Sequence, residues 1–155
     1  MHTIVETTDL SKGQKLQLFE LWNKEYPKKL CYETLVDFEN YLGKLENKTH
    51  FLLTDENLKI VGWALLFERE NETWFVKIID ASFQRKGFGQ KLLERLKSKT
   101  NILNGWVIDH NNDKKSNGSD YKSPINFYIR NQFKINNTIR LELDIISAAK
   151  IEWTK

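Results

Sequence analysis

The part of the sequence best suited to chemistry is a short glycine-containing run, Gln84-Arg85-Lys86-Gly87-Phe88-Gly89-Gln90, between an apolar strand pattern and a helical pattern. The first amides of a helix have no partner inside the helix and carry partial positive charge, so they can bind phosphate groups. Gly87 and Gly89 remove side chains that would keep a phosphate from the backbone. Arg85, Lys86 and Lys91 add positive charge. The segment therefore predicts a site for a highly anionic ligand.

Two other phosphate motifs do not match this run. The dinucleotide fingerprint needs a glycine at the position of Leu92, and the P-loop needs Gly-Lys followed by Ser or Thr, which is absent. The run instead resembles the acetyl-CoA signature of the GNAT acetyltransferase superfamily, Gln/Arg-x-x-Gly-x-Gly/Ala, which Gln84, Gly87 and Gly89 satisfy. Strand and helix patterns flank the run as they do in that family.

The resemblance implies an N-acetyltransferase that takes acetyl-CoA as cosubstrate and needs no metal. It implies that the strand before the run splays away from the strand near Gly105, and that the pantetheine arm inserts between them. The residues that it assigns to acetyl-CoA binding are Lys77, Ile78 and Ile79, by their main chain, and Gln84, Arg85, Lys86, Gly87, Phe88, Gly89 and Gln90.

A second resemblance covers Ser123 to Phe133, which is similar to the family's helix with a Tyr, three residues, Gly and Phe. It implies that Tyr128 is the general acid that protonates the departing thiolate. The alternative is a tyrosine that only packs beside Phe127 and Phe133. The sequence departs from the family pattern in two places, because Gln132 replaces the glycine and Ala81 replaces a frequent proline.

A general base is harder to assign. Asp109 and His110 end a strand on the expected acceptor side, and histidine has the more suitable ordinary pKa. Asp80 is a further candidate. An amine can also lose its proton through a chain of water molecules, in which case no base is needed. The loop Asn111 to Lys122 is expected either to shape the acceptor pocket or to be merely solvated, and the sequence does not specify the acceptor.

Apolar periodicity predicts a mixed α/β layer fold, in the order β-α-α-β-β-β-α-β-α-β-β, and this order resembles that of the GNAT fold. The expected strands are Thr3–Glu6, His50–Thr54, Lys59–Glu68, Thr73–Asp80, Gly105–Ile108, Thr138–Ile146 and Ala148–Trp153; the expected helices are Ser11–Tyr26, Glu33–Leu45, Gly87–Lys97 and Ser123 to about Phe133. The short connections between residues 50 and 80 predict an antiparallel meander. Residues 1–155 are expected to form one domain.

Composition limits the other functions. With 24 basic and 21 acidic residues, the net charge of +3 argues against a nucleic-acid partner. No apolar run is long enough to cross a membrane and no secretory signal is readable, so a cytoplasmic location is expected. Cys31 is alone and is expected to be an inert thiol. The alternatives are a non-catalytic acyl-CoA-binding module and, less favoured, a nucleic-acid-binding domain that stacks bases on Trp63, Trp74 or Trp106. A homodimer is possible.

Overall fold

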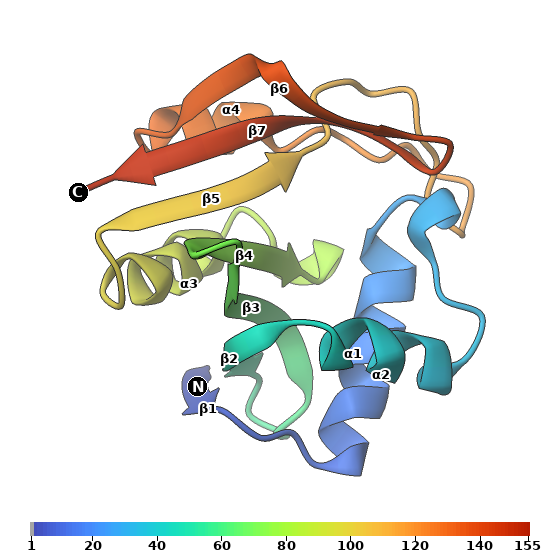
Figure 1. Cartoon of the computed structure of the whole chain (residues 1–155). Coiled ribbons are helices and arrows are strands. Elements are labelled where there is room, and N and C mark those ends of the chain that lie inside the picture. The colour runs from blue at the N-terminus through green and yellow to red at the C-terminus, as the bar shows by residue number, and fades with distance from the viewer. Residues whose placement is uncertain (1) are drawn as a thin grey trace.

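The computed structural model describes residues 2–155, which form a seven-stranded mixed sheet with helices on both faces (Figure 1). The strand order is β1-β2-β3-β4-β5-β7-β6, and β4 and β5 are the parallel pair. The strands are β1 (Thr3–Thr7), β2 (Glu46–Thr54), β3 (Ile60–Arg69), β4 (Glu72–Ile79), β5 (Ile102–Val107), β6 (Lys134–Leu143) and β7 (Ile146–Thr154). This is the predicted mixed α/β fold, with the predicted order of elements.

The helices divide the core into two layers. On one face, α1 (Lys12–Glu25) and α2 (Leu35–Gly43) cover a cluster that includes Leu18, Phe38 and Trp63. On the other face, α3 (Phe88–Lys97) packs Leu92, Leu93 and Leu96 onto the sheet, beside α4 (Ile125–Arg130). Short 3-10 turns occupy Lys28–Leu30 and Ala81–Phe83. The sheet therefore separates two hydrophobic clusters, one on each of its faces.

The first two helices begin where polar caps satisfy free amides. The Ser11 hydroxyl accepts a hydrogen bond from the Gln14 amide, and the Gln14 side chain accepts one from the Ser11 amide, which is a capping box. The Thr34 hydroxyl accepts from the Asp37 amide at the start of α2. Both helices therefore start close to the predicted positions, and Pro27 follows α1 as expected.

The meander is confirmed, because β2, β3 and β4 pair antiparallel in sequence order. Among the first five strands, β2 and β5 have boundaries that differ from the prediction by more than one residue. β2 begins at Glu46 instead of His50, because the polar residues before His50 still pair with β3 across a register shift. β5 covers Ile102–Val107 instead of Gly105–Ile108, because its first residues pair with the end of β7.

The C-terminal third also needs correction. α4 ends at Arg130 because Gln132 takes a left-handed conformation (φ 70°) and the Phe133 amide donates to the Tyr128 carbonyl, a Schellman-type ending. β6 then starts at Lys134, four residues before the predicted Thr138. The tight turn falls between Leu143 and Ile146. Ser147, which falls between the two predicted strands, lies in β7 and accepts a hydrogen bond from Arg140.

Within residues 2–155, none of the helices has the length and apolar character that a membrane crossing requires.

Candidate active site

β4 and β5 pair at one point and then separate. Trp74 is in register with Asn104, whose side-chain amide donates to the Thr73 carbonyl at 3.1 Å. At the other end of β4, the Asp80 amide donates to the Val61 carbonyl on β3. Because backbone groups alternate sides along a strand, Lys77 and Ile79 direct their peptide groups at the gap, while those of Ile78 pair with β3. The predicted splay is present, and two of the three predicted main-chain positions face it.

The loop after β4 is fixed by hydrogen bonds and leads into the N-terminus of α3. The Asp80 carboxylate accepts from the Ser82 amide, and the Gln84 side chain donates to the Ile79 carbonyl at 3.0 Å. Gly87 has φ 85°, a conformation that side chains disfavour, and it caps α3 without a side-chain hydrogen bond. A Cβ atom at Gly87 would meet nothing within 4 Å. The first amides of α3 therefore lie beside open space.

Three cations surround this helix start. Arg85, Lys86 and Lys91 are exposed, and none of them forms an ion pair within residues 2–155. The Lys86 and Lys91 amines lie above the Phe83 and Phe88 rings, 5.5 Å from each centroid. Phe88 and Gln90 are half-buried in the first turn, and Gln90 donates to Glu94 at 3.5 Å. The residues predicted to bind a diphosphate thus lie together, and Gln84 stabilises the loop through its hydrogen bond to the Ile79 carbonyl.

Lys77 directs its amine into the cleft between α3 and α4. Its Nζ atom would lie 3.2 Å from a Cβ at Gly89 and is 4.3 Å from the centroid of the Phe127 ring. Burial lowers the pKa of Lys77 to about 8, because the charged form loses water. Sequence reasoning assigned only the main chain of Lys77, so the position of this amine is new information.

Tyr128 lies at the junction of α4 and the gap. Its ring packs edge-on against Phe127 and Phe133, with centroids 5.2 Å away in both cases, and 5.7 Å from Phe75. Burial raises the pKa of Tyr128 far above its ordinary value, which keeps the phenol protonated. Tyr128 also lines the cavity described next. Tyr128 thus packs against neighbouring aromatic rings and also lines the cavity.

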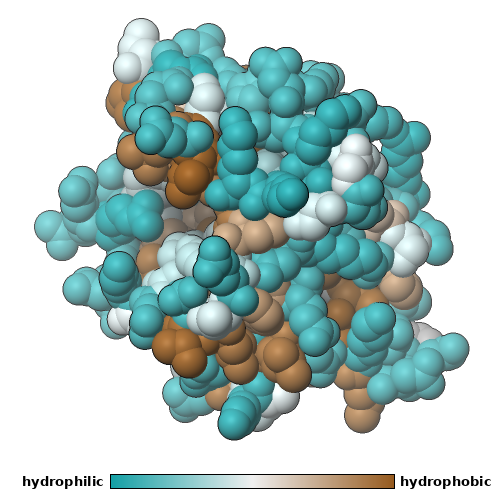
Figure 2. All heavy atoms as spheres, turned by 90° about the vertical axis from the view of Figure 1, so that its right-hand side faces the viewer, coloured by the Kyte–Doolittle hydropathy of each residue, from teal (hydrophilic) through white to brown (hydrophobic). Residues whose placement is uncertain are grey.

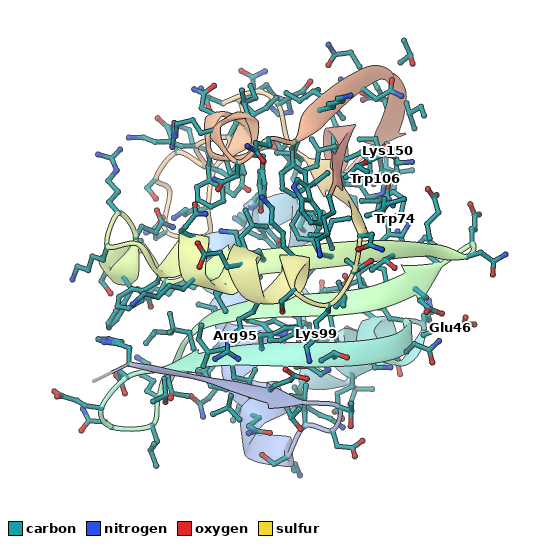
Figure 3. All side chains as sticks on the ribbon, turned by 90° about the vertical axis from the view of Figure 1, so that its left-hand side faces the viewer. Glu46, Trp74, Arg95, Lys99, Trp106 and Lys150 are labelled. Atoms are coloured by element: carbon teal, nitrogen blue, oxygen red, sulfur yellow. The ribbon has the colours of Figure 1, made fainter. Side chains whose placement is uncertain are left out.

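A cavity of about 460 Å³ crosses the sheet through the gap. On the α3 face it is lined by Phe75, Val107 and Tyr128; on the α1 and α2 face it is lined by Trp22, Val76 and Trp106. Trp74 and Trp106 lie side by side in its wall, with ring centroids 5.3 Å apart (Figure 3). Figure 2 shows apolar side chains around a hollow on the face that carries α1 and α2. Residues from both faces of the sheet therefore line the cavity, and the hollow in Figure 2 is on the side of α1 and α2.

The predicted base candidates do not line this cavity. Asp109 forms a two-pronged ion pair with Arg140, at 2.9 and 3.0 Å, which lowers the pKa of Asp109. His110 accepts from the Asn112 amide through Nδ1, and its Nε2 lies 4.0 Å from Asp113. Asp80 pairs with Lys24 at 2.6 Å. All three are engaged by other residues at the ends of strands and in loops, and none of them is among the residues that line the cavity.

Sequence reasoning missed two groups. Glu25 is buried at the end of α1, where it accepts from the Ala81 amide at 2.9 Å and pairs with Lys115 at 2.8 Å. It ties the loop Asn111–Lys122 to the turn after β4, so that this loop is fixed against the body. The second group is the aromatic wall from α1, the segment after it and α2: Trp22, Tyr26, Tyr32 and Tyr41. Their aromatic spacing was visible, but it was indistinguishable from ordinary core.

Comparison with known families decides the relationship. The family model described as acetyltransferase (GNAT) domain matches residues 47–135, which is more than half of the chain and spans the meander, the Gln84–Gln90 run and α4. The chain belongs to the GNAT acetyltransferase family. No curated protein matches the sequence significantly.

Solved GNAT structures share the fold over the whole chain. A GNAT-family acetyltransferase from Staphylococcus aureus is 17% identical with a TM-score of 0.70, covering 99% of both chains. An aminoglycoside 6'-N-acetyltransferase complexed with coenzyme A is 14% identical with a TM-score of 0.73, covering 98% of this chain and 96% of the other. A phosphinothricin acetyltransferase from Sinorhizobium meliloti, in complex with acetyl-CoA, is 12% identical with a TM-score of 0.68, covering 99% of this chain and 88% of the other. At these identities the likeness establishes the GNAT fold alone.

Proposed function

We propose that this GNAT chain is an N-acetyltransferase that moves the acetyl group of acetyl-CoA to an amine by direct attack. The observation that supports this best is the cavity that crosses the sheet between β4 and β5. It contains Tyr128 and the part of β4 at Lys77, beside which a thioester would lie, and its wall from α1 and α2 leaves space for an amine. Related folds have been solved with coenzyme A and with acetyl-CoA.

The start of α3 would bind the diphosphate. Its first amides are free of side-chain caps, Gly87 leaves room for oxygen atoms, and Arg85, Lys86 and Lys91 supply the charge. The peptide groups of Lys77 and Ile79 would pair with the pantetheine arm, in place of the strand partner that they lack. An N–H at this edge can also stabilise the negative charge that develops on the acyl oxygen.

In the proposed reaction, a neutral amine attacks the thioester carbonyl carbon, the C–N bond forms and the C–S bond breaks. Burial holds the Tyr128 phenol in the protonated form, so it donates a hydrogen bond and then its proton to the departing sulfur, and it recovers a proton from the water that accepts one from the nitrogen. The cavity lining contains neither a carboxylate nor a histidine. The nitrogen therefore passes its proton to water and not to Asp109, His110 or Asp80.

Calorimetric titration with acetyl-CoA tests the proposal. We expect saturable binding by the unaltered protein and its loss in Gly89→Glu, whose carboxylate would enter the cleft beside Lys77 and repel a diphosphate. Gly13→Glu is the matched control, because Gly13 lies in the first turn of α1 with nothing within 4 Å of its Cβ position. Absence of binding by folded, unaltered protein would exclude the acetyltransferase. Binding without release of coenzyme A on any amine would favour a non-catalytic acyl-CoA-binding module.

A further inference from the structure

The wall of the cavity on the acceptor side is aromatic and carries no negative charge. Its charged members are Arg69 and Lys77, both cations, and its remaining polar groups include five tyrosine hydroxyls. Those tyrosines are Tyr26, Tyr32, Tyr41, Tyr121 and Tyr128. A site built for a polycation would need carboxylates to replace the water that several ammonium groups lose. This wall offers none.

Carboxylates that lie near the outside of the cavity are already engaged. Glu25 is held by Lys115 and the Ala81 amide, Asp80 by Lys24, and Asp109 by Arg140. Each of these carboxylates already has a cationic partner. An incoming ligand with two or more positive charges would therefore find no carboxylate among the residues that line the cavity.

Neither cation of the cavity lining forms an ion pair within residues 2–155, and Arg69 is the one that is exposed to solvent. Its guanidinium lies over the Phe67 ring, 5.2 Å from the centroid, and over the Trp74 ring at 5.4 Å. Within residues 2–155 it forms no ion pair, and it is exposed at the end of β3, at one edge of the cavity. An unpaired arginine that packs against two rings presents several N–H donors in one plane. Both oxygens of a carboxylate can accept hydrogen bonds from these donors.

The distance between Arg69 and the gap between β4 and β5 determines how long a ligand must be to reach both. Trp74, under the guanidinium, is three residues before Lys77 on β4, so the two levels are about 10 Å apart at roughly 3.3 Å per residue. The space between them is lined by aromatic side chains and by Leu141 and Ile146 of the hairpin that β6 and β7 form. A ligand whose anion lies at hydrogen-bond distance from Arg69 can reach both levels with an apolar spacer such as a benzene ring that carries one methylene group.

From this arrangement we infer that the acceptor is a single amine joined through an apolar or aromatic spacer to an anionic group, which Arg69 binds. The inference rests on the proposed acetyl transfer and specifies its substrate class. The amine reaches the gap beside Tyr128, the spacer lies among the aromatic rings, and the anion stays at the solvent-facing edge. A carboxylate is the simplest such anion.

Three benzylic amines with the same reacting group test this inference: 4-(aminomethyl)benzoate, benzylamine and 1,4-bis(aminomethyl)benzene. The measurement is kcat/KM for release of coenzyme A from acetyl-CoA. We expect the benzoate to exceed benzylamine by about tenfold, as one charge-assisted pair can supply, and the diamine to be the poorest. In Arg69→Gln the ratio of benzoate to benzylamine should fall to about one. Arg95→Gln, which removes a cation on the far side of α3 (Figure 3), should leave this ratio unchanged.

The outcomes separate the two proposals. A preference for the diamine, or a benzoate ratio that survives Arg69→Gln, would overturn the inference while leaving acetyl transfer intact. If none of the three amines releases coenzyme A, the inference is also overturned, and the calorimetric titration then decides the proposed function. Binding of acetyl-CoA in that titration would keep the cosubstrate site, and its absence would remove both proposals.

Discussion

At the scale of single residues, the site is governed by what burial does to two side chains. Tyr128 and Lys77 are neighbours in the cleft, with the Lys77 amine 5.8 Å from the centroid of the Tyr128 ring. Burial favours the neutral form in both cases, so it raises the pKa of the phenol and lowers that of the amine. The cleft thus holds a proton donor and a cation that is poised to lose its charge.

Tyr128→Phe tests the proton donor. Removal of the hydroxyl keeps the packing against Phe127 and Phe133, so acetyl-CoA affinity should stay the same, while kcat should fall about a hundredfold because the thiolate leaves without a proton. The measurements are steady-state kinetics and calorimetry on the same preparation. Tyr41→Phe removes another cavity phenol, on α2, and should keep most of the activity. An unchanged kcat in Tyr128→Phe would mean that Tyr128 only packs.

Lys77→Met tests the buried amine through stability. Because the pKa of Lys77 is lower in the folded state, the unfolded chain binds more protons between pH 8 and its ordinary value of 10.5, and the folded state gains stability as pH rises through that window. At pH 7 the substitution should therefore stabilise the protein by about 1–3 kcal/mol, and the gain should shrink by pH 10. Denaturant unfolding at both pH values measures it.

Lys86→Met is the matched control for this stability effect. Lys86 is exposed, so its replacement should change stability little at either pH. A gain for Lys77→Met that stays the same at pH 7 and pH 10 would show that added apolar contact, and not relief of a buried charge, is responsible.

At the scale of elements, sequence patterns gave correct types and less accurate ends. Periodicity and caps identified α1, α2 and α3, because one face of each meets the sheet. The end of α4 and the start of β6 were wrong because backbone geometry at Gln132, and not a break in hydrophobic pattern, ends the helix. The end of β6 and the start of β7 were wrong because the turn falls between Leu143 and Ile146. The predicted cap Ser123 does accept from the Ile125 amide, at 3.2 Å, and the helix starts two residues after it.

Gln132 provides a test of that geometry. The resemblance to the family marked this position as one where glycine is usual, and the positive φ of 70° explains why, since a side chain is strained there. Gln132→Gly should raise the free energy of unfolding by up to about 1 kcal/mol, and Gln132→Val should lower it by at least as much. Thermal unfolding of the three proteins checks the order. Equal stabilities would mean that the αL turn relaxes at no cost.

At the scale of the whole molecule, the candidate site combines segments that are far apart in the sequence. The Gln84–Gln90 run could be predicted because its residues are contiguous and its chemistry is local. The acceptor wall could not, because it joins residues from α1, α2, β3, β4, β5, the loop before α4 and the hairpin of β6 and β7. Asp109 and His110 were reasonable base candidates on strand position, but the position of Arg140 on β6 depends on a register shift that the sequence does not reveal.

The passage through the sheet has a kinetic consequence. The cavity is lined by residues from both faces of the sheet, so both substrates can occupy the molecule together and no side chain has to carry the acetyl group between half-reactions. Initial rates at several fixed acceptor concentrations should therefore give intersecting, not parallel, double-reciprocal lines. Since each product occupies the position of the substrate from which it was formed, coenzyme A should compete with acetyl-CoA and the acetylated amine should compete with the acceptor. Parallel lines would point to an acetylated form of the protein as an intermediate.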